Sequence, residues 1–385
     1  MTTSKIFKPT QIHATTNTSQ SNGTDLTSTT INGILDQVFL QDNSAEDTPE
    51  QKVLRASTQT PNTPDDIPFT RKEMLQVVKS LNNAKAPGPD GINNQVLKLI
   101  NKTSPEILLK FYNKCLAHHC FPDCFKIGQI VLFSKKNKNP EDPSSYRPIN
   151  LLPAIGKLLE RLLINRLKYH VFKDNKISSC QFGFKPNSST IHAIDAALTQ
   201  IQVNKAQQLH SALLCLDLKN AFDSLWWPAV KQALRDLQCP RNLYLTTTDY
   251  LHNRKSIVLH NNSVITRQQA RGCPQGSCMS ADLWNFTFNH IIDHHWPAHT
   301  KIVAFADDVA FIINGRTREQ LQENSNNTLQ IFNALCKRIK LQSSHQKSQA
   351  LIVHKPGRTI TRNPTFKIDN HRIRCVKTIN YLGLT

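Results

Sequence analysis

The sequence IVAFADDVAFII, residues 302–313, consists of two apolar arms around an acidic pair. Two apolar runs that flank a short polar break predict a β-hairpin, which places Asp307 and Asp308 at its tip. A second apolar run, Ala212–Leu218, fits a buried strand and contains Asp217 near its end. Carboxylates at the edge of an apolar core are costly unless they bind cations or find polar partners. Strand ends that lie side by side would bring these three carboxylates together.

The three carboxylates have an ordinary explanation and a functional one. Taken singly, Asp307-Asp308 fits a turn dipeptide and Asp217 fits a strand-terminal cap. Taken together, each beside an apolar strand, they predict a site for two Mg²⁺ ions, because Mg²⁺ prefers carboxylate oxygens. Paired ions stand about 3.5–4 Å apart in many phosphoryl-transfer sites. Mn²⁺ is the alternative ion.

Helical patterns occupy much of the chain before the Ala212–Leu218 run. A helix should begin after Thr70, because Glu73 follows three residues later as in a capping box. Further helices are predicted over residues 94–100, 105–118 and 151–169, with a short strand over residues 129–133. In the 151–169 helix we expect Glu160 to be one of the polar residues that separate the apolar positions. Helices interleaved with few strands indicate an α+β domain.

The N-terminal residues differ in composition from the rest of the chain. Residues 1–66 are rich in Thr, Ser, Asn and Gln, so we expect a polar and mostly disordered segment with one short helix around Ile31–Leu40. Residues 67–125 are predicted to form a helical N-terminal extension with a rigid turn at Lys85–Ile92. Residues 126–385 are predicted to form the main domain.

The chain is strongly basic, with 47 Lys and Arg residues against 28 Asp and Glu residues and a net charge of +19. The charge is uneven, since residues 1–68 carry four basic and eight acidic side chains and the remainder is net +23. Such an excess favours a polyanionic partner, because neutralising phosphates releases condensed counterions. The nucleic-acid partner is therefore expected to bind the remainder.

Ten scattered cysteines follow an N-terminus that has no apolar signal segment. Reduced thiols are the natural interpretation, so we expect an intracellular protein of the cytoplasm or the nucleus that is not secreted. No stretch offers the roughly 20 apolar residues needed to span a bilayer, and no membrane partner is expected.

The acidic motifs belong to an ordered set of short motifs. Along the chain these are Lys85–Ile92, Tyr146–Ile149, Gly156–Glu160, Gln181–Phe184, Asp217–Asp223, Arg271–Ser277, Phe305–Asp308 and Tyr381–Gly383. In order and spacing the set resembles the motifs of reverse transcriptases from non-LTR, LINE/jockey-type retrotransposons. Phe305–Asp308 is similar to the (Tyr/Phe)-x-Asp-Asp box of that family, and Arg271–Ser277 to its Arg-Gly-x-Pro-Gln-Gly-Ser motif. The resemblance covers about Phe69–Thr385.

The resemblance implies a right-hand polymerase with fingers and a palm that contains an antiparallel sheet. The implied activity is RNA-templated DNA synthesis by two-metal deoxynucleotidyl transfer to a primer 3′ end, in retrotransposon mobility. The implied partners are an RNA template, a DNA primer and deoxynucleoside triphosphates. The sequence makes no prediction about the oligomeric state.

The resemblance also implies roles for individual residues. The implied metal ligands and catalytic residues are Asp217, Asp307 and Asp308. The implied nucleotide-binding residues are Lys135, Arg147, Phe222, Gln275, Gly276 and Lys347.

The nucleotide-binding residues have distinct implied tasks. Lys135 and Arg147 would bind the triphosphate, while Gln275 and Gly276 would line the nucleotide and template pocket. Phe222 would stack under the sugar and exclude a ribose 2′-hydroxyl, and a core Phe is its ordinary alternative. Lys347 would protonate pyrophosphate. The ordinary alternative for Lys135 is a solvated member of the basic run that begins there, and for Lys347 a plain surface lysine.

The C-terminus departs from the family pattern. The chain stops at Thr385, directly after Tyr381–Gly383, where family members continue into a helical thumb. We therefore expect a truncated copy or a partial gene without a thumb. The second hypothesis is a catalytically inactive, RNA-binding remnant of such an element. A third, an RNA-dependent RNA polymerase with the same palm, is opposed by Phe222.

Overall fold

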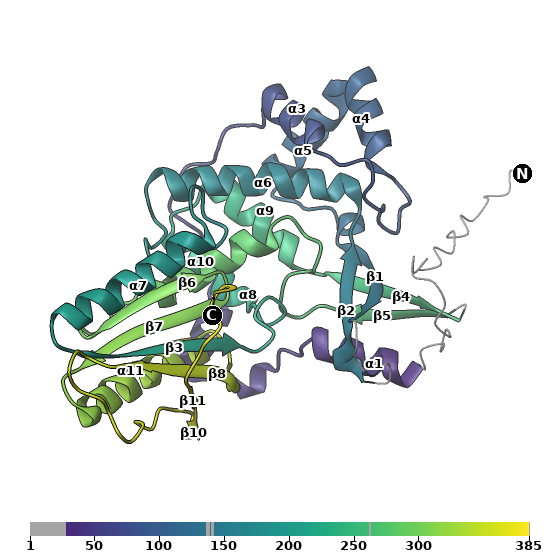
Figure 1. Ribbon diagram of the computed structural model, residues 1–385. Helices are drawn as coiled ribbons and strands as arrows, with labels where there is room; N and C mark the ends of the chain where they lie inside the picture. The colour runs from purple at the N-terminus through teal and green to yellow at the C-terminus, as the bar shows by residue number, and fades with distance from the viewer. Residues whose placement is uncertain (1–27, 136–138, 140–141, 262, 385) are drawn as a thin grey trace, which may run out of the picture. The chain divides into compact units, whose positions relative to one another are not determined.

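The computed structural model describes residues 28–135, 139, 142–261 and 263–384 (Figure 1). The chain forms two compact units, each built from three separate segments. Unit 1 contains the described parts of residues 1–42, 62–167 and 240–280. Unit 2 contains those of residues 43–61, 168–239 and 281–385.

Unit 1 combines helices with a four-stranded sheet. Its helices are α1 (Ser28–Val38), α3 (Arg71–Lys79), α4 (Asn94–Thr103), α5 (Pro105–Ala117), most of α6 (Ala154–Lys173), and α9 (Arg241–Leu251), with the short 3-10 helices η2 (Asp123–Phe125) and η3 (Pro143–Ser145). Its strands are β1 (Ile127–Ser134), β2 (Tyr146–Leu151), β4 (Lys255–His260) and β5 (Ser263–Gln268). The strand order is β2-β1-β4-β5, with β1 antiparallel to β2 and parallel to β4.

Local sequence signals account for the helices at the start of unit 1. The predicted capping box is confirmed, because the Thr70 side chain accepts a hydrogen bond from the Glu73 N–H and the Glu73 carboxylate accepts one from the Thr70 N–H. Pro105 stands in the first turn of α5, where its missing N–H has no cost. The helices predicted over residues 94–100 and 105–118 are confirmed as α4 and α5.

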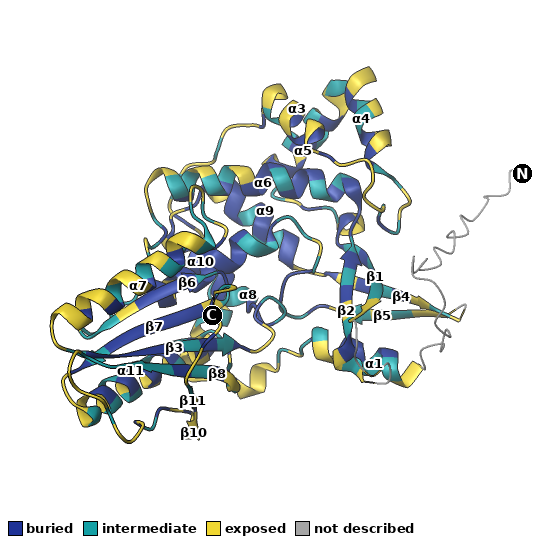
Figure 2. Cartoon of the chain, in the orientation of Figure 1, coloured by how far each residue is buried: buried dark blue, intermediate teal, exposed yellow. Residues whose placement is uncertain are grey.

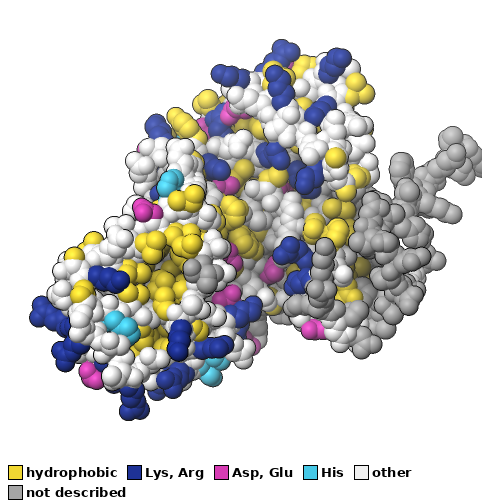
Figure 3. All heavy atoms as spheres, in the orientation of Figure 1, with side chains coloured by type: hydrophobic (Ala, Val, Ile, Leu, Met, Phe, Trp, Pro, Cys, Tyr) yellow, Lys and Arg dark blue, Asp and Glu magenta, His cyan; other side chains and the backbone are white. Residues whose placement is uncertain are grey.

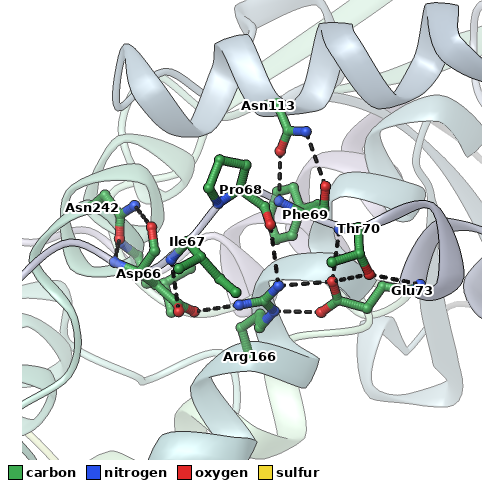
Figure 4. A network of polar contacts seen from close by, with 10 residues as sticks. Asp66, Ile67, Pro68, Phe69, Thr70, Glu73, Asn113, Arg166 and Asn242 are labelled. Atoms are coloured by element: carbon green, nitrogen blue, oxygen red, sulfur yellow. Dashed lines mark hydrogen bonds and ion pairs between the residues drawn. The ribbon is translucent and has the colours of Figure 1, made fainter.

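A partly buried arginine connects the segment before α3 to helix α6 (Figure 4). The Arg166 guanidinium forms ion pairs with the carboxylates of Glu73 and Asp66, and its Nη2 donates to the Pro68 carbonyl at 3.4 Å. Burial opposes the ionisation of Glu73, but hydrogen bonds from Arg166 and Thr70 outweigh it and lower its pKa from 4.5 to about 2. The ion pairs therefore stabilise unit 1 only while the carboxylates are ionised.

The Glu73→Gln variant should be less stable than the parent chain by roughly 2 kcal/mol at pH 7. This free energy is smaller than the full pKa shift implies, because the side chain is 28% exposed and water screens the ion pair. Because the pKa is lowered in the folded chain, this stabilisation is complete above about pH 5 and disappears as the pH falls toward 2. Urea unfolding at pH 7 and pH 3 measures the difference, and Glu106→Gln on α5 is the control. A Glu73→Gln deficit that stays constant with pH would contradict the assignment.

Unit 2 is built around a five-stranded sheet. Its strands are β3 (His210–Leu218), β6 (Thr300–Phe305), β7 (Asp308–Gly315), β8 (Ser343–Val353) and β11 (Arg374–Val376), in the order β11-β8-β3-β7-β6. All neighbours are antiparallel except β11 and β8. Its helices are α2 (Pro49–Ala56), α7 (Thr190–Ala206), α8 (Trp227–Asp236), α10 (Ser280–Ile292) and α11 (Arg318–Arg338), with the short η1 (Ser44–Glu46) and a small hairpin of β9 (Lys367–Ile368) and β10 (His371–Arg372).

Helices cover both faces of the β3, β7 and β6 region, so these strands form the core of unit 2 (Figure 2). Alternate residues of β7 point to opposite faces. Ile312 packs with Ala193 and Ala197 of α7, whereas the ring of Phe311 lies 5.4 Å from that of Phe332 on α11. Burial on both faces explains why β3 and β7 have almost continuous apolar sequences.

The predicted strand and hairpin are confirmed as β3 and the β6–β7 pair. The mixture of helices with mainly antiparallel sheets also agrees with the predicted α+β class. The helix predicted from residue 151 begins instead at Ala154, because Leu151 still pairs with Gln129 in the β1–β2 ladder.

The expectation of disorder is wrong for residues 28–66, while residues 1–27 lie outside the described residues. The predicted short helix is confirmed as α1, and α2 packs on unit 2. The fully buried Asp47 carboxylate forms ion pairs with Arg55 and Lys340, whose cationic groups lie 5.4 and 5.2 Å from the ring of Trp226. Lys340 and Trp226 lie far along the chain from Asp47, so the polar composition of the segment gave no sign of these two contacts.

Among the described residues, no helix combines the length and the apolar character needed to cross a membrane. No disulfide joins any of the ten cysteines, all of which lie in the described ranges.

Candidate active site

The ends of β3 and β7 bring the acidic motifs together in unit 2. These strands pair in antiparallel register from His210↔Gly315 to Leu216↔Val309. Continuing that register by one residue places Asp217 opposite Asp308, and Asp307 precedes Asp308 in the turn. Directly opposite residues on neighbouring strands have their side chains on the same face of the sheet. The predicted convergence of the two acidic motifs is therefore present in the backbone.

The local backbone is irregular at both acidic motifs. Ala306, the first residue of the two-residue turn between β6 and β7, has a φ of +59°, in the left-handed region that few non-glycine residues adopt. On β3 the pairing with β8 shifts between Cys215 and Asp217, and the Asp217 N–H donates to the Ser348 hydroxyl at 3.2 Å. Such irregularities redirect side chains and are frequent beside active sites.

The three carboxylates influence one another electrostatically. Burial raises the pKa of Asp307, and the charge of Asp217 raises it further. Burial also raises the pKa of Asp308, with added contributions from Asp307 and Asp217. One oxygen of Asp217, Oδ2, is buried with no hydrogen-bond partner among the described residues, and the Lys347 ammonium lies 3.8 Å from it. Positive charge at this position is therefore favourable.

The described residues do not include a ready-made group of three or more His, Cys, Asp or Glu side chains that could hold a metal ion. The chemistry of the trio nevertheless fits Mg²⁺. All three side chains offer hard oxygen ligands, and one buried oxygen, Asp217 Oδ2, has no hydrogen-bond donor within the described part of the chain. A cation among them would relieve the repulsion that raises the pKa values of Asp307 and Asp308.

Phe222 and Lys347 also lie in unit 2. The Phe222 ring is only half-buried, 5.5 Å from the ring of buried Trp284 and 6.5 Å from that of exposed Phe184. It is therefore not enclosed in the core, which was its ordinary alternative. Lys347 has a side chain that is 74% exposed and pairs with Asp217, so it is a surface lysine that also contacts the acidic site.

The predicted triphosphate-binding residues lie on the β1–β2 hairpin of unit 1. Arg147 pairs with Phe133 of β1, and Lys135 lies one residue beyond the end of β1, where its N–H donates to the Ser145 carbonyl at 2.7 Å. Both side chains are exposed. The Lys135 ammonium donates to the Ser144 carbonyl at 2.9 Å. The other lysines of the basic run, Lys136 and Lys138, lie outside the described residues.

Gln275 and Gly276 lie in a loop that is fixed to β2, the strand that carries Arg147. The Asn150 N–H donates to the Gln275 carbonyl at 2.7 Å. A Cβ on Gly276 would lie 2.3 Å from the Asn150 carbonyl oxygen, and the φ of Gly276 is +137°. Only glycine permits both this conformation and this close approach. Lys135, Arg147, Gln275 and Gly276 therefore all lie in unit 1.

A buried carboxylate supports the same loop, and its environment differs from the one that we predicted from the sequence. Glu160 was expected among the polar positions of its helix, but it is 1% exposed. Its Oε2 accepts hydrogen bonds from the Ser277 hydroxyl and the Cys278 N–H, both at 2.8 Å, and the Ser277 hydroxyl lies 2.7 Å from the buried Tyr250 hydroxyl. Burial raises the pKa of Glu160, while the charge of Arg254 opposes this. The signal that could have revealed it is the single acidic residue within a run of leucines.

The predicted site residues thus fall into two sets, one in each unit. Unit 2 holds Asp217, Asp307, Asp308, Phe222 and Lys347, whereas unit 1 holds Lys135, Arg147, Gln275 and Gly276.

Sequence comparisons agree with these motifs. The family model described as "Reverse transcriptase (RNA-dependent DNA polymerase)" matches residues 134–385. The chain is 28% identical over 313 residues to the "Retrovirus-related Pol polyprotein from type-1 retrotransposable element R1" of Bradysia coprophila, covering 81% of this chain and 31% of that protein. It is 26% identical over 333 residues to the "RNA-directed DNA polymerase from mobile element jockey" of Drosophila melanogaster, covering 82% and 35%.

The chain therefore spans about a third of the length of the curated relatives it matches. The resemblance to polymerases of non-LTR retrotransposons is confirmed by these matches. Since the family model covers most of the chain and includes both acidic motifs, the chain belongs to the reverse transcriptase (RNA-dependent DNA polymerase) family.

Proposed function

We propose that the chain carries out RNA-templated DNA synthesis by deoxynucleotidyl transfer to a primer 3′ end. The observation that supports this most directly is the β3–β7 register, which runs to Leu216↔Val309 and, extended by one residue, places Asp217 opposite Asp308. Three carboxylates at adjacent strand ends, two of them with raised pKa values, suit a reaction that brings several phosphate charges together.

Two Mg²⁺ ions would be held by Asp217, Asp307 and Asp308, and when bound they would lower the barrier for attack by the primer hydroxyl and neutralise the departing pyrophosphate. Lys347, beside Asp217, would supply a proton to the pyrophosphate. The partly exposed ring of Phe222 would lie under the sugar of the incoming nucleotide. These roles extend the family resemblance to individual residues of this chain.

In the same proposal, the sheet of unit 2 is the palm and the β1–β2 hairpin of unit 1 belongs to the fingers. Lys135 and Arg147 on that hairpin would bind the triphosphate, because a guanidinium can donate two parallel hydrogen bonds to phosphate oxygens. Gln275 and Gly276 would line the pocket for the nucleotide and the template base.

The surface charge supports a nucleic-acid partner. Exposed basic side chains gather over α3 to α5 (Figure 3), namely Arg71, Lys72, Lys79, Lys85, Lys102, Lys110 and Lys114. Such a surface would bind phosphates without regard to sequence and release counterions, so binding should weaken as salt increases. The names of the relatives point to the mobility of a retrotransposable element as the setting.

Primer extension on an RNA template with a DNA primer, deoxynucleotides and Mg²⁺ tests the proposal. The expected result is a DNA product whose yield depends on Mg²⁺ concentration. Retention of salt-sensitive template–primer binding without any extension would overturn the proposal and favour the inactive RNA-binding remnant.

The Phe222→Ala variant tests whether Phe222 selects deoxynucleotides over ribonucleotides as substrates. Removing the ring should raise ribonucleotide incorporation relative to deoxynucleotide incorporation by roughly 10- to 100-fold, because a single steric contact discriminates by about 1–3 kcal/mol. Single-nucleotide extension with each substrate measures the ratio, and Phe184→Ala, which removes a neighbouring exposed ring, is the matched control. Efficient ribonucleotide use by the parent chain would favour an RNA polymerase instead.

A further inference from the structure

Gln181 is a completely buried amide that contacts the turn carrying Asp307. Its side-chain oxygen accepts hydrogen bonds from the Ala306 N–H at 3.1 Å and the Gly183 N–H at 2.9 Å. Its side-chain nitrogen lies 3.5 Å from the Ala306 carbonyl oxygen, at the outer limit of a hydrogen bond. The amide therefore accepts from and approaches the backbone of Ala306, the residue before Asp307 and two residues before Asp308.

The backbone around Gln181 is also attached to the hairpin. The Phe182 N–H donates to the Ala304 carbonyl at 2.8 Å, and the Ala304 N–H donates to the Cys180 carbonyl at 2.9 Å. A Cβ on Gly183 would lie 2.1 Å from the Ala306 nitrogen, so the two backbones touch. The Gly183 carbonyl in turn accepts from the Asn285 side chain at 2.7 Å. The segment Gln181–Phe184 thus lies directly against the outer strand of the hairpin and its turn.

The turn needs such support because its conformation is unfavourable. Ala306 has a φ of +59°, and a non-glycine residue keeps such a conformation only when its surroundings enforce it. The turn residues also carry carboxylates that repel one another. Without the Gln181 oxygen, two buried N–H groups would lose their acceptor, and the turn could relax toward an ordinary conformation. A shift of about 1 Å at a catalytic group can lower a rate roughly 100-fold.

We propose that Gln181 is a positioning residue for the catalytic turn: it holds Ala306 in its left-handed conformation and thereby fixes the directions of Asp307 and Asp308. The kinetic part of this inference rests on the proposed polymerase function. The structural part, that Gln181 determines the local stability of the turn, does not.

The test compares Gln181→Leu with Asn204→Leu. Asn204 on α7 is an equally buried amide. It contacts β3 and β7 at the ends that lie away from the acidic residues, where it donates to the Ser211 hydroxyl at 2.9 Å and accepts from the Asn314 side chain at 3.3 Å. Both variants lose a buried amide, but only Gln181→Leu affects the turn. Hydrogen–deuterium exchange of peptides that cover the β6–β7 turn measures local stability, and steady-state primer extension measures kcat and the KM for template–primer.

For Gln181→Leu we expect turn amides to exchange at least about 10-fold faster, and kcat to fall roughly 10- to 100-fold with an unchanged KM for template–primer. For Asn204→Leu we expect similar melting-temperature loss but parent-like turn exchange and kcat. If Gln181→Leu does not fold, Gln181→Asn replaces it, because its amide is one methylene too short to reach Ala306.

Parent-like turn exchange in the Gln181 variants would overturn the proposal, as would faster exchange with unchanged kcat. If the parent chain shows no extension at all, the proposed function fails, and the exchange experiment alone still decides whether Gln181 holds the turn.

Discussion

Replacing Asp307 and Asp308 together by Asn is expected to abolish primer extension while leaving the fold intact or more stable. The rate should fall by at least about 1,000-fold, because two metal ligands supply several kcal/mol of transition-state stabilisation and each 1.4 kcal/mol is worth about tenfold. Stability should not fall, because burial and mutual repulsion raise the pKa values of both carboxylates, which marks their charges as unfavourable in the folded chain.

Opposite effects on rate and stability distinguish a functional site from a structural one. Primer extension gives the rate, and thermal unfolding in the same buffer gives the stability. Asp236→Asn is the control, because Asp236 lies on α8 of unit 2 and its carboxylate bonds to the His290 side chain at 2.6 Å. That change should cost a little stability and leave the rate unchanged. Equal rates for the double variant and the parent chain would rule out these carboxylates as metal ligands.

The second large effect is expected for Gly276→Ala. The added methyl group would lie 2.3 Å from the Asn150 carbonyl oxygen, at a φ of +137° that an L-residue rarely adopts. The loop must therefore move away from β2, which breaks the hydrogen bond between the Asn150 N–H and the Gln275 carbonyl. We expect an unfolding free energy lower by about 3 kcal/mol and a value of kcat/KM for the nucleotide lower by roughly 100-fold.

Gly91→Ala is the matched control in the same unit. Gly91 also has a positive φ, of +69°, but nothing lies within 4 Å of the position of its Cβ. Its replacement should cost about 1 kcal/mol of stability and leave kcat/KM unchanged. Urea unfolding and single-nucleotide kinetics measure both variants. Equal effects of the two substitutions would show that backbone conformation alone, and not the contact with Asn150, makes glycine necessary at position 276.

Much of the secondary structure could be predicted because its signals are local. The apolar arms of residues 302–313 specify a hairpin by themselves, since each strand is buried on both faces and needs an apolar side chain at nearly every position. Thr70 and Glu73 specify a helix start through hydrogen bonds that span three residues. The family motifs are likewise contiguous, so the candidate catalytic residues could be identified without a fold.

The supporting polar residues could not be predicted in the same way. Glu160 stands beside Arg161 between two pairs of leucines, and its partners Ser277 and Cys278 follow more than 110 residues later. Gln181 belongs to a recognised motif, but its contact with Ala306 crosses 125 residues. A sequence indicates that such a residue is polar and does not indicate whether folding brings it an acceptor, a donor or water.

Sequence alone therefore determined the core strands, the β6–β7 hairpin, most of the helices in the α3 to α6 region and the identity of the acidic residues. Only the tertiary structure decided that residues 43–61 belong to unit 2, that Glu160 is buried beneath the loop of Gln275 and Gly276, and that Gln181 contacts the turn between β6 and β7. The physical reason is that periodicity and capping act within a few residues, whereas burial of a polar group is tolerated only where distant parts of the chain meet to satisfy it.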